Sequence, residues 1–537
     1  MTHAIRLLIL AATLLTGSLV PAAADTLDLD AATIADLNAA FRAGTLTSEK
    51  LLQFCLDRIK AFDRQGPSLH AVITLNPKAL EIARSLDAER KTKGARSPLH
   101  GVPVVLKDNY DTFDLATTGG SVLLEGSIPP DDAFVVRKLR DAGAIILAKV
   151  NLSEFASGGA FSSLGGQSLN PHDLTRSPSG SSGGTGVAIA AAYATLGMGT
   201  DTGGSIRGPS TSNGIVGLKP THGLLSRDGI IPLSLSFDTG GPMARSVYDV
   251  AVALGIMTGV DPADAATTKS EGRFDTDYTK YLKADALRGA RIGIARDFMG
   301  ADADVDWVME SSLDAMRKAG ATVVDVAYPK WLLAAKEEWY TSVRWPEFPV
   351  QMAAYLATLK PGYPRTIDEM IERAERFNAP GESAGPNPSR WSLFKREAGA
   401  GTLDDYRYTS VHDYALPMVR TVIDGILAAQ KLDAIVYPTS SRRPGVIASS
   451  PDSAPATAAA SATNIANLTG YPDLIVPAGF TGDRLPVGLS FFGTAFSEPR
   501  LLALGYAFEQ ATHARRRPVH TPLLPGQSIA VLPGDRR

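Results

Sequence analysis

Residues 201–220 read DTGGSIRGPSTSNGIVGLKP, a stretch in which glycines and hydroxyl side chains crowd around one arginine. Glycine at this density indicates that the backbone itself must approach something closely. Backbone N–H groups in the run from Thr202 through Gly203 and Gly204 to Ser205 can converge on one point, where they bind an anion or stabilise an oxyanion. A pair of flexible turns explains the composition equally well. The choice between a binding turn and flexible turns therefore depends on other parts of the sequence.

A second glycine- and serine-rich stretch, PSGSSGGTG at 178–186, is joined to the first by VAIAAAYATLGM at 187–198. The joining segment is apolar on all sides and predicts a buried helix, which would return the chain and bring the two loops together. The loop also matches G-x-S-x-G with Ser182 as a nucleophile, the motif of an α/β-hydrolase. That motif requires a preceding strand, whereas the polar, proline-broken NPHDLTRSPS precedes it, so this alternative is disfavoured.

The N-terminus has the layout of a secretory signal peptide, residues 1–24. Arg6 is followed by the apolar run 7–15 and by a small-residue site at 22–24, which predicts cleavage after Ala24 and a periplasmic or secreted protein. An uncleaved anchor is the alternative, although the run is shorter than the about 20 residues that span a bilayer. No later segment approaches a membrane span, so no membrane contact is expected after signal removal.

Composition narrows the possible partners of the chain. The 537 residues carry a net charge of −3, which argues against a nucleic-acid partner because phosphate binding needs a basic face. The single cysteine, Cys55, falls on a predicted helix at 48–62, in register with Leu51 and Ile59, and is expected to be buried and inert. No nucleotide-binding loop, HExxH motif or paired cysteine ligands are present, so we expect neither a cofactor nor a metal.

Two related segments predict the fold class. RKLRDAGAIILAK at 137–149 and DAMRKAGATVVDV at 314–326 each combine the end of a helix, a glycine and a short β-branched run. Gly143 and Gly320 fit the left-handed position just beyond a helix. Further continuous apolar runs predict strands covered on both faces, at 102–106, 292–295, 434–437, 474–476 and 487–492. The pattern predicts a layered α/β/α fold with a mixed, mostly parallel central sheet covered by helices.

Composition also divides the chain. Residues 327–415 hold most of the tryptophans and many charges, and we interpret them as a variable helical insertion in a single domain at 25–512. Residues 513–537 are rich in proline and arginine and predict a loosely held tail.

A serine nucleophile needs a base, and no histidine lies beside the two loops. Lys107 and Lys149 each close an apolar strand, the end at which ligands collect in open α/β sheets. Reasoning from these residues alone does not choose between the two lysines.

Several blocks together resemble the amidase signature family. They are GVPVVLKDN, AKVNLSEFASG, GSSGG before the apolar segment, DTGGSIRGP, GLKPT, LDAIVYPT, NLTGYPDLIVPAGF and LPVGLSFFG, in this order along residues 30–260 and 430–512. The resemblance implies the amidase signature fold and hydrolysis of amides without a cofactor.

The resemblance also implies a Ser–cis-Ser–Lys triad. Its lysine is Lys107, its bridging serine is Ser181 after a cis peptide bond from Gly180, and its nucleophile is Ser205, which lies 205 − 181 = 24 positions further on. The oxyanion would rest on N–H groups of the run from Thr202 through Gly203 and Gly204 to Ser205. Ser182 would either hydrogen-bond within the relay or act as a structural turn serine. Lys149 matches a second family lysine outside the triad.

Other residues of the matched blocks have weaker assignments. We interpret Asp201 and Arg207 as a structural ion pair that holds the turn. Asn109, Asn151 and Glu154 receive no role. Lys107 must be uncharged to act as a base, which burial can achieve, and we therefore expect the neighbouring Asp108 to point elsewhere.

The sequence thus predicts an exported amidase that cleaves linear carboxamides through an acyl-enzyme. The segment SRDGIIPLSLSFDTGGPMARS at 226–246 resembles secreted peptide amidases, which remove a C-terminal amide. Aryl-acylamide, ester and carbamate substrates stay open, and the tRNA-dependent amidotransferase branch of the family is disfavoured because its partners are cytosolic. A periplasmic binding protein that holds an anionic solute in the glycine-rich loops is a distant alternative. The substrate's acyl group, the released amine and the oligomeric state are not predicted.

Overall fold

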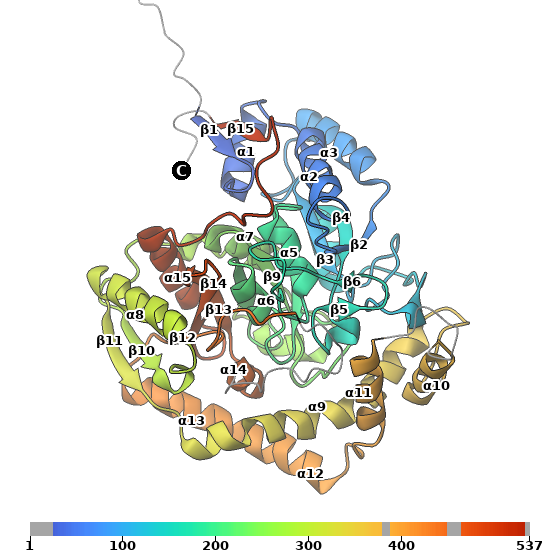
Figure 1. Cartoon of the computed structure of the whole chain (residues 1–537), viewed down its shortest axis with the longest axis vertical. Coiled ribbons are helices and arrows are strands. Elements are labelled where there is room, and N and C mark those ends of the chain that lie inside the picture. Colours follow the sequence, from blue (N-terminus) through green and yellow to red (C-terminus); the bar gives the residue numbers. More distant parts are fainter. Residues whose placement is uncertain (1–24, 378–386, 448–462, 532–537) are drawn as a thin grey trace, which may run out of the picture.

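The computed structural model describes residues 25–377, 387–447 and 463–531, so the predicted signal peptide lies outside the described residues. A long twisted sheet forms the centre of the molecule (Figure 1). Its strands, in spatial order, are β11 (Thr322–Val326), β10 (Arg291–Ala295), β12 (Ala434–Pro438), β14 (Pro486–Phe492), β13 (Asp473–Phe480), β8 (Val216–Lys219), β9 (Thr239–Ala244), β7 (Leu196–Asp201), β3 (Pro103–Lys107), β4 (Ile145–Val150) and β2 (Val72–Leu75).

Strand direction differs from the expectation. In the described part of the chain, parallel neighbours lie at the two flanks, in β11–β10–β12 and in β7–β3–β4. The pairs β12–β14, β14–β13, β13–β8, β8–β9, β9–β7 and β4–β2 are antiparallel. The sheet is mixed as predicted, but it is not mostly parallel, because a continuous apolar run reports burial of both strand faces and carries no information on direction.

Helices cover both faces of the sheet, which confirms the layered α/β/α fold. In β3, Val104 and Leu106 belong to one apolar cluster and Val105 to another, because successive side chains point to opposite faces. The first cluster contains side chains of α1 (Ile34–Arg42), α4 (Phe134–Asp141), α7 (Val247–Met257), α8 (Ala303–Lys318) and α15 (Glu498–Thr512). The second contains side chains of α2 (Ser48–Phe62), α3 (Ala79–Lys93) and α5 (Gly183–Ala190), and α6 (Arg207–Ser212) packs against α5.

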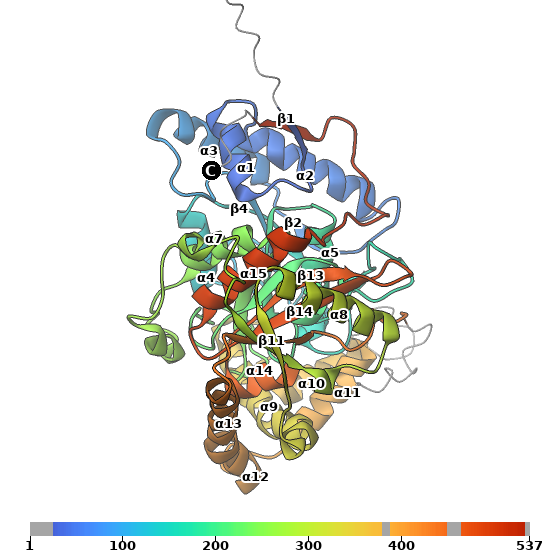
Figure 2. The same cartoon turned by 90° about the vertical axis from the view of Figure 1, so that its left-hand side faces the viewer.

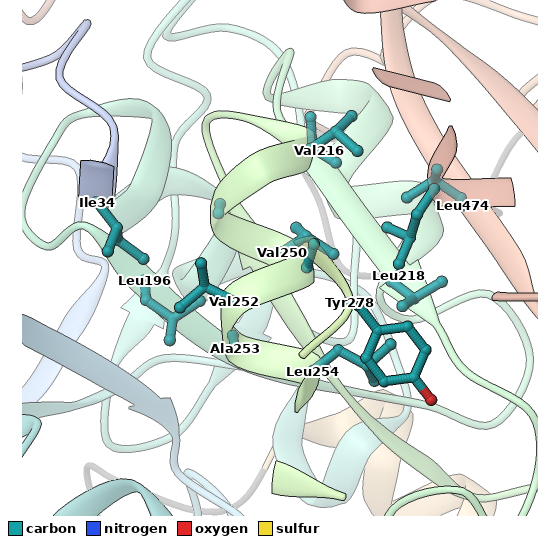
Figure 3. Close-up of a cluster of buried hydrophobic side chains, with 14 of the residues drawn as sticks. Ile34, Leu196, Val216, Leu218, Val250, Val252, Ala253, Leu254, Tyr278 and Leu474 are labelled. Atoms are coloured by element: carbon teal, nitrogen blue, oxygen red, sulfur yellow. The ribbon is translucent and has the colours of Figure 1, made fainter. Parts of the chain in front are cut away.

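Helix α7 lies at the centre of the first cluster and is buried almost all round. Figure 3 shows its apolar side chains between residues contributed by α1, β7, β8 and β13. The labelled neighbours are Ile34, Leu196, Val216, Leu218, Tyr278 and Leu474, and each is at most 1% exposed. This packing fixes β7, which ends at the first residue of the 201–220 stretch, and β8, which lies near the end of that stretch.

The segment expected as a helical insertion supplies a layer of its own. It contains α9 (Lys330–Thr358), α10 (Ile367–Phe377), α11 (Pro388–Ala398), α12 (Tyr406–Thr409) and a π-helix at Ser410–Ala415, followed by α13 (Leu416–Ala429). Figures 1 and 2 show these helices gathered at one end of the molecule. There α14 (Thr463–Thr469) packs against α9 and α13.

The apolar segment 187–198 is a helix for only part of its length. Helix α5 ends at Ala190, the backbone turns at Ala192 with φ +56°, and β7 begins at Leu196. An apolar run does not distinguish a buried helix from a buried strand, so the prediction of a helix over the second half is wrong. The consequence drawn from it holds, since the Ser182 N–H donates to the Ser205 carbonyl at 3.1 Å and the two loops meet.

The C-terminal segment is not loosely held as far as residue 531. Strand β15 (Ser528–Val531) pairs antiparallel with β1 (Asp25–Asp28). The buried Arg58 of α2 donates to the carbonyls of Thr521 and Pro522 and to Gln527 Oε1. The arginine content of the segment suggests exposure. The prediction fails because the segment packs against α2, where the buried Arg58 binds its backbone.

Other local expectations are confirmed. Helix α2 begins at Ser48 and ends at Phe62, with Cys55 buried in it. Gly143 and Gly320 follow α4 and α8 with φ of +86° and +95°. Within the described ranges, no helix has the length and apolar character needed to cross a membrane.

Candidate active site

Lys107 and Ser181 meet at the end of β3. Lys107 Nζ donates to Ser181 Oγ and to Thr200 Oγ1, both at 2.7 Å. Thr200 lies on the neighbouring strand β7, so two adjacent parallel strands and the loop before α5 build the contact. Lys107 is 0% and Ser181 3% exposed, which excludes most water from this pair.

The surroundings of Lys107 favour an uncharged amine. Burial lowers the pKa of Lys107 from 10.5 to about 7, although the carboxylates of Asp201 and Asp238 act in the opposite direction. Desolvation penalises the charged form and outweighs the two carboxylates. At neutral pH a large fraction of Lys107 is therefore an amine able to accept a proton.

Asp108 points away from Lys107, as expected. Its carboxylate lies 3.2 Å from Lys149 Nζ and accepts from the hydroxyl and the N–H of Thr118. Lys149 also donates to the Tyr110 carbonyl at 2.7 Å and to Thr117 Oγ1 at 2.7 Å. Lys149 is thus held in a structural ion pair, so Lys107 is the strand-end lysine that contacts Ser181.

The loop before α5 is shaped by close backbone contacts. The peptide bond between Gly180 and Ser181 is cis. A Cβ on Gly184 would stand 2.3 Å from the Asn151 carbonyl oxygen, so only glycine lets the start of α5 pack there. Ser182 is buried, its Oγ donates to the Thr200 carbonyl at 3.2 Å, and the Thr200 N–H donates back to it at 3.2 Å. Ser182 therefore fixes β7 against the loop and is not placed as a nucleophile.

Asp201 and Arg207 form the predicted ion pair, with 3.0 Å between Arg207 Nη2 and Asp201 Oδ1. Asp201 also accepts from the N–H groups of Gly204 at 2.9 Å and Ile206 at 3.0 Å. Arg207 reaches Asp473 of β13 at 3.0 Å. Burial opposes the charge of Asp201, but the Arg207 guanidinium beside it holds the pKa of that carboxyl well below its usual range. The pair fixes the turn that carries Ser205.

The glycine-rich turn itself is only partly covered. Ser205 and Gly203 are partly exposed, while Thr202 and Gly204 are buried. Gly204 has φ +119°, a conformation that favours glycine, and its N–H is directed to Asp201. Gly204 therefore shapes the turn, and its N–H is not available as the expected oxyanion donor.

Two residues outside the expected set hold this turn. The Thr202 hydroxyl donates to Asp238, which also accepts from the N–H groups of Leu233 and Ser234. A Cβ on Gly203 would stand 2.7 Å from the hydroxyl oxygen of Tyr340. Tyr340 belongs to α9, so the helical layer at 330–415 reaches the turn.

Lys219, in the GLKPT block, shows why a low pKa alone does not identify the base. Burial and the nearby Arg207 lower the pKa of Lys219 to about 7 as well. Its Nζ donates to the carbonyls of Pro220 and Tyr471, at 3.2 and 2.8 Å. Lys219 therefore has a structural place, and the contact with Ser181 singles out Lys107.

Of the three residues without an assigned role, two are structural. Asn151 donates to the His70 and Gly166 carbonyls, and Glu154 accepts from Ser121 and from the Asn387 N–H at the start of α11. Asn109 donates to Thr200 Oγ1 at 3.1 Å, and its own Oδ1 has no hydrogen-bond partner among the described residues. Asn109 belongs to the site.

A narrow pocket opens beside these groups. Its lining combines polar residues, among them Asn109, Thr200, Thr202, Arg227 and Asp238, with the apolar residues Ile230, Ile231, Leu233 and Leu235. Over the described residues, no group of three or more His, Cys, Asp or Glu side chains is arranged to hold a metal ion. What the site offers is two serines, a buried amine and backbone N–H groups.

A family model described as Amidase matches residues 50–502. The chain belongs to the amidase family. The native peptide amidase from Stenotrophomonas maltophilia has a solved structure with 41% identity and a TM-score of 0.81, covering 91% of this chain and 99% of that one. A probable amidase of Arabidopsis thaliana is 34% identical over 506 residues, covering 92% of each chain. A glutamyl-tRNA(Gln) amidotransferase subunit of Deinococcus radiodurans is 36% identical over 493 residues, covering 89% and 96%.

The amidase is therefore an amide-hydrolysing enzyme, as the sequence blocks implied. Sequence reasoning missed Thr200, Asp238 and Tyr340 at its site. Thr200 immediately precedes the DTGGS block and Asp238 lies in the 226–246 segment, so both were within reach of motif reading. Tyr340 lies more than a hundred residues away in a segment with no matched block, and only the fold places it at the turn.

Proposed function

We propose that this amidase cleaves the C–N bond of linear carboxamides through an acyl-enzyme on Ser205, with Ser181 and Lys107 as its proton relay. The observation that carries the proposal is the 2.7 Å contact between Lys107 Nζ and Ser181 Oγ, made in a fully buried setting. A lysine serves as a base only when its amine is uncharged, and burial brings its pKa to about 7.

The first half of the reaction forms the acyl-enzyme. Ser205 Oγ attacks the amide carbonyl carbon, its proton passes to Ser181 Oγ, and the Ser181 proton passes to Lys107 Nζ. The negative charge that develops on the carbonyl oxygen is stabilised by backbone N–H groups of the turn that carries Ser205. The C–N bond then breaks as Ser181 returns a proton to the departing nitrogen and Lys107 restores the Ser181 proton.

The second half releases the acid. Water takes the place of the departed amine, loses a proton to the same relay and attacks the ester carbon. The bond between the acyl carbon and Ser205 Oγ breaks, and the proton returns to Ser205. Thr200 supports both halves because it accepts a hydrogen bond from Lys107 and thereby orients the amine toward Ser181.

The preferred substrates that we propose are C-terminal peptide amides. The supporting likeness is the peptide amidase neighbour, which has higher identity than the amidotransferase relative. A further support is Asn109 Oδ1, an acceptor with no hydrogen-bond partner among the described residues, which belongs to a residue that lines the pocket. Anilides, esters and carbamates are the alternatives. We also propose export, for which residues 1–24 are the support.

An alkylphosphonate that labels activated serines tests the mechanism. The purified chain is treated with the reagent and digested, and the modified peptide is identified by mass spectrometry. We expect one label, on Ser205, and no label in Lys107→Ala. A label on Ser182, or an unlabelled wild-type chain that still hydrolyses amides, contradicts the proposal.

A substrate panel tests the preference separately. Hydrolysis of matched peptide amides, anilides, methyl esters and carbamates is followed at equal concentration. We expect kcat/KM to be highest for the peptide amides, whereas a higher value for anilides or carbamates would reassign the substrate and leave the mechanism intact.

A further inference from the structure

A cavity of about 560 Å³ lies at the end of the central strands opposite to the end that carries the active site. In the β7–β9 pair, Asp201 faces Thr239 near the active site, while Leu196 faces Ala244 at the other end. Arg245 follows Ala244 directly and lines the cavity together with Thr33, Ser246, Glu509, His513 and Arg515. The starts of α1 and α7, the end of α15 and the C-terminal segment therefore line it.

Two arginines in this cavity carry unsatisfied donors. Arg245 is 6% exposed; its Nη1 donates to the Ala194 and Ile189 carbonyls, while its Nε has no partner among residues 25–377, 387–447 and 463–531. Arg515 Nε and Nη2 are buried and likewise have no partner within those ranges. Buried donors without acceptors are costly, because they have lost water and gained nothing in exchange.

The two guanidinium groups also repel one another. Burial lowers the pKa of Arg515 to about 10, and the charge of Arg245 acts in the same direction. Two like charges held close together in a partly dry cavity are stabilised by an anion that contacts both.

Among the described residues, no acidic side chain forms an ion pair with Arg245 or Arg515. The charges of Asp249 and Asp30 act on Arg245 from a distance and partly offset the effect of burial. Asp249 Oδ1 accepts from the Ile34 N–H at 2.7 Å, and Glu509 accepts from the Val247 N–H at 3.0 Å. Asp30 accepts from Arg517 with both oxygens, and Asp36 accepts from Thr33 in the capping box of α1. Burial raises the pKa of Glu509 to about 8, so this carboxyl is mostly uncharged at neutral pH.

We propose that the cavity binds a small oxyanion, a phosphate or a carboxylate, that bridges Arg245 of the domain to Arg515 of the C-terminal segment. The planar guanidinium group matches the oxygens of either anion. The bound anion would hold the segment from 513 onward against the sheet and would stabilise the folded chain without entering the active site. This role is independent of the substrate proposed above.

Thermal unfolding of the purified full chain tests this proposal. The melting temperature is measured against inorganic phosphate and, separately, acetate, at constant ionic strength set with sodium chloride. We expect a saturable rise of about 2–4 °C with phosphate, because an anion that binds only the folded state shifts the equilibrium toward it. A rise with acetate as well assigns the site to carboxylates too.

Two variants localise the effect. Arg515→Gln should lose the phosphate-dependent rise, while Arg516→Gln, the same change at the exposed neighbouring position, should keep it. Calorimetric titration of phosphate into the wild-type chain keeps the test valid should Arg515→Gln fold poorly, and should give one site per chain. The proposal is overturned by equal responses of the two variants, by a rise that chloride reproduces, or by the absence of a binding heat. kcat/KM at low temperature should not respond to phosphate.

Discussion

Lys107 and Lys219 experience similar burial, and both have a pKa of about 7, yet only one of them contacts a serine. Lys219 donates to two backbone carbonyls, which have no proton to give, so its low pKa has no chemical use in the relay. Lys107 donates to two hydroxyls instead, and a hydroxyl can reverse the direction of its hydrogen bond. The partner of each amine, more than its pKa, decides which lysine serves as the base.

The pH dependence of turnover follows from the pKa of Lys107. Below about 7 the amine of the free enzyme is charged and cannot accept the Ser181 proton, so kcat/KM should fall about tenfold per pH unit. Above that pH it should level off. The measurement is kcat/KM between pH 5 and 9 with a peptide amide that does not titrate in this range. A profile that stays flat from pH 5.5 to 8.5 would be incompatible with Lys107 as the base.

The free energy of unfolding should also depend on pH through the lowered pKa of Lys107. The pKa of Lys107 is lowered in the folded state, so between about 7 and 10.5 the unfolded chain binds more protons, and stability rises with pH. Below pH 7 the destabilisation is complete and constant. Lys107→Met removes it, so the stability of the variant relative to wild type should decrease by about 3 kcal/mol from pH 7 to pH 9.5.

Urea unfolding of both proteins at several pH values measures this difference. Lys219 and the buried tyrosines titrate in both proteins and cancel in the comparison. A difference between variant and wild type that does not change with pH would mean that Lys107 keeps its ordinary pKa in the folded chain.

Helix α9 connects the variable layer to the turn that carries Ser205. Its Glu347 accepts from the Ser234 hydroxyl at 2.6 Å and from the Ser236 N–H at 3.2 Å, next to the segment that holds Asp238. Its Tyr340 stacks on Phe237 with 5.4 Å between ring centroids and places its hydroxyl over Gly203. The helix therefore supports the turn, and we expect the Tyr340 hydroxyl to contact bound substrate as well.

Removing only the Tyr340 hydroxyl should separate these two roles. Tyr340→Phe keeps the stacked ring, so we expect the melting temperature to stay within a degree or two of wild type. A hydroxyl that contacts bound substrate contributes about 1 kcal/mol, so kcat/KM should fall roughly 5–10-fold. Tyr406→Phe, at an 85% exposed position of α12, is the matched control and should change neither quantity. Lost stability with unchanged kinetics would make Tyr340 a purely structural residue.

The secondary structure shows where sequence reading succeeds and where it stops. Helix α2 and strands β3, β10, β12 and β14 are predictable because each is a clear amphipathic or continuous apolar pattern. Strand β9, TGGPMA, has no such pattern. Its residues are mostly small, and they are buried because neighbouring elements cover them. Strand β7 begins within the apolar run 187–198, for which the sequence pattern predicts a single helix.

The candidate site is predictable to the extent that it lies in contiguous motifs. Lys107, Ser181 and Ser205 come from blocks that resemble a known family, and Asp201 with Arg207 from charge and proximity in sequence. Tyr340 and the Arg207–Asp473 contact join positions that are far apart along the chain, and such contacts depend on tertiary packing alone.

At the scale of the whole molecule, the two ends of the described chain stabilise each other. Strand β1 has β15 as its partner, and Arg517 contacts Asp28 and Asp30 at 2.9 and 2.6 Å. Arg58 is 1% exposed and depends on residues 521–527 for three of its hydrogen bonds. The C-terminal segment is therefore part of the fold, although the residues that form the candidate catalytic contacts all lie before it.

Deleting residues 513–537 should consequently lower stability without altering the chemistry. The deletion removes three of the four described hydrogen bonds of the Arg58 guanidinium and leaves the one to the Ala191 carbonyl, at 2.7 Å. A hydrogen bond to a charged group contributes about 1.5–3 kcal/mol, and the loss of β15 exposes the edge of β1, so we expect a fall of several kcal/mol in the free energy of unfolding. Arg58→Met in the full chain should reproduce part of this loss, because methionine needs no acceptor but leaves the carbonyls unpaired. Thermal unfolding measures stability, and kcat at 10 °C checks the site, which should retain most of its activity. An unchanged melting temperature of the truncated chain would contradict this prediction. It would mean that neither the packing of the segment nor the hydrogen bonds of Arg58 stabilise the fold.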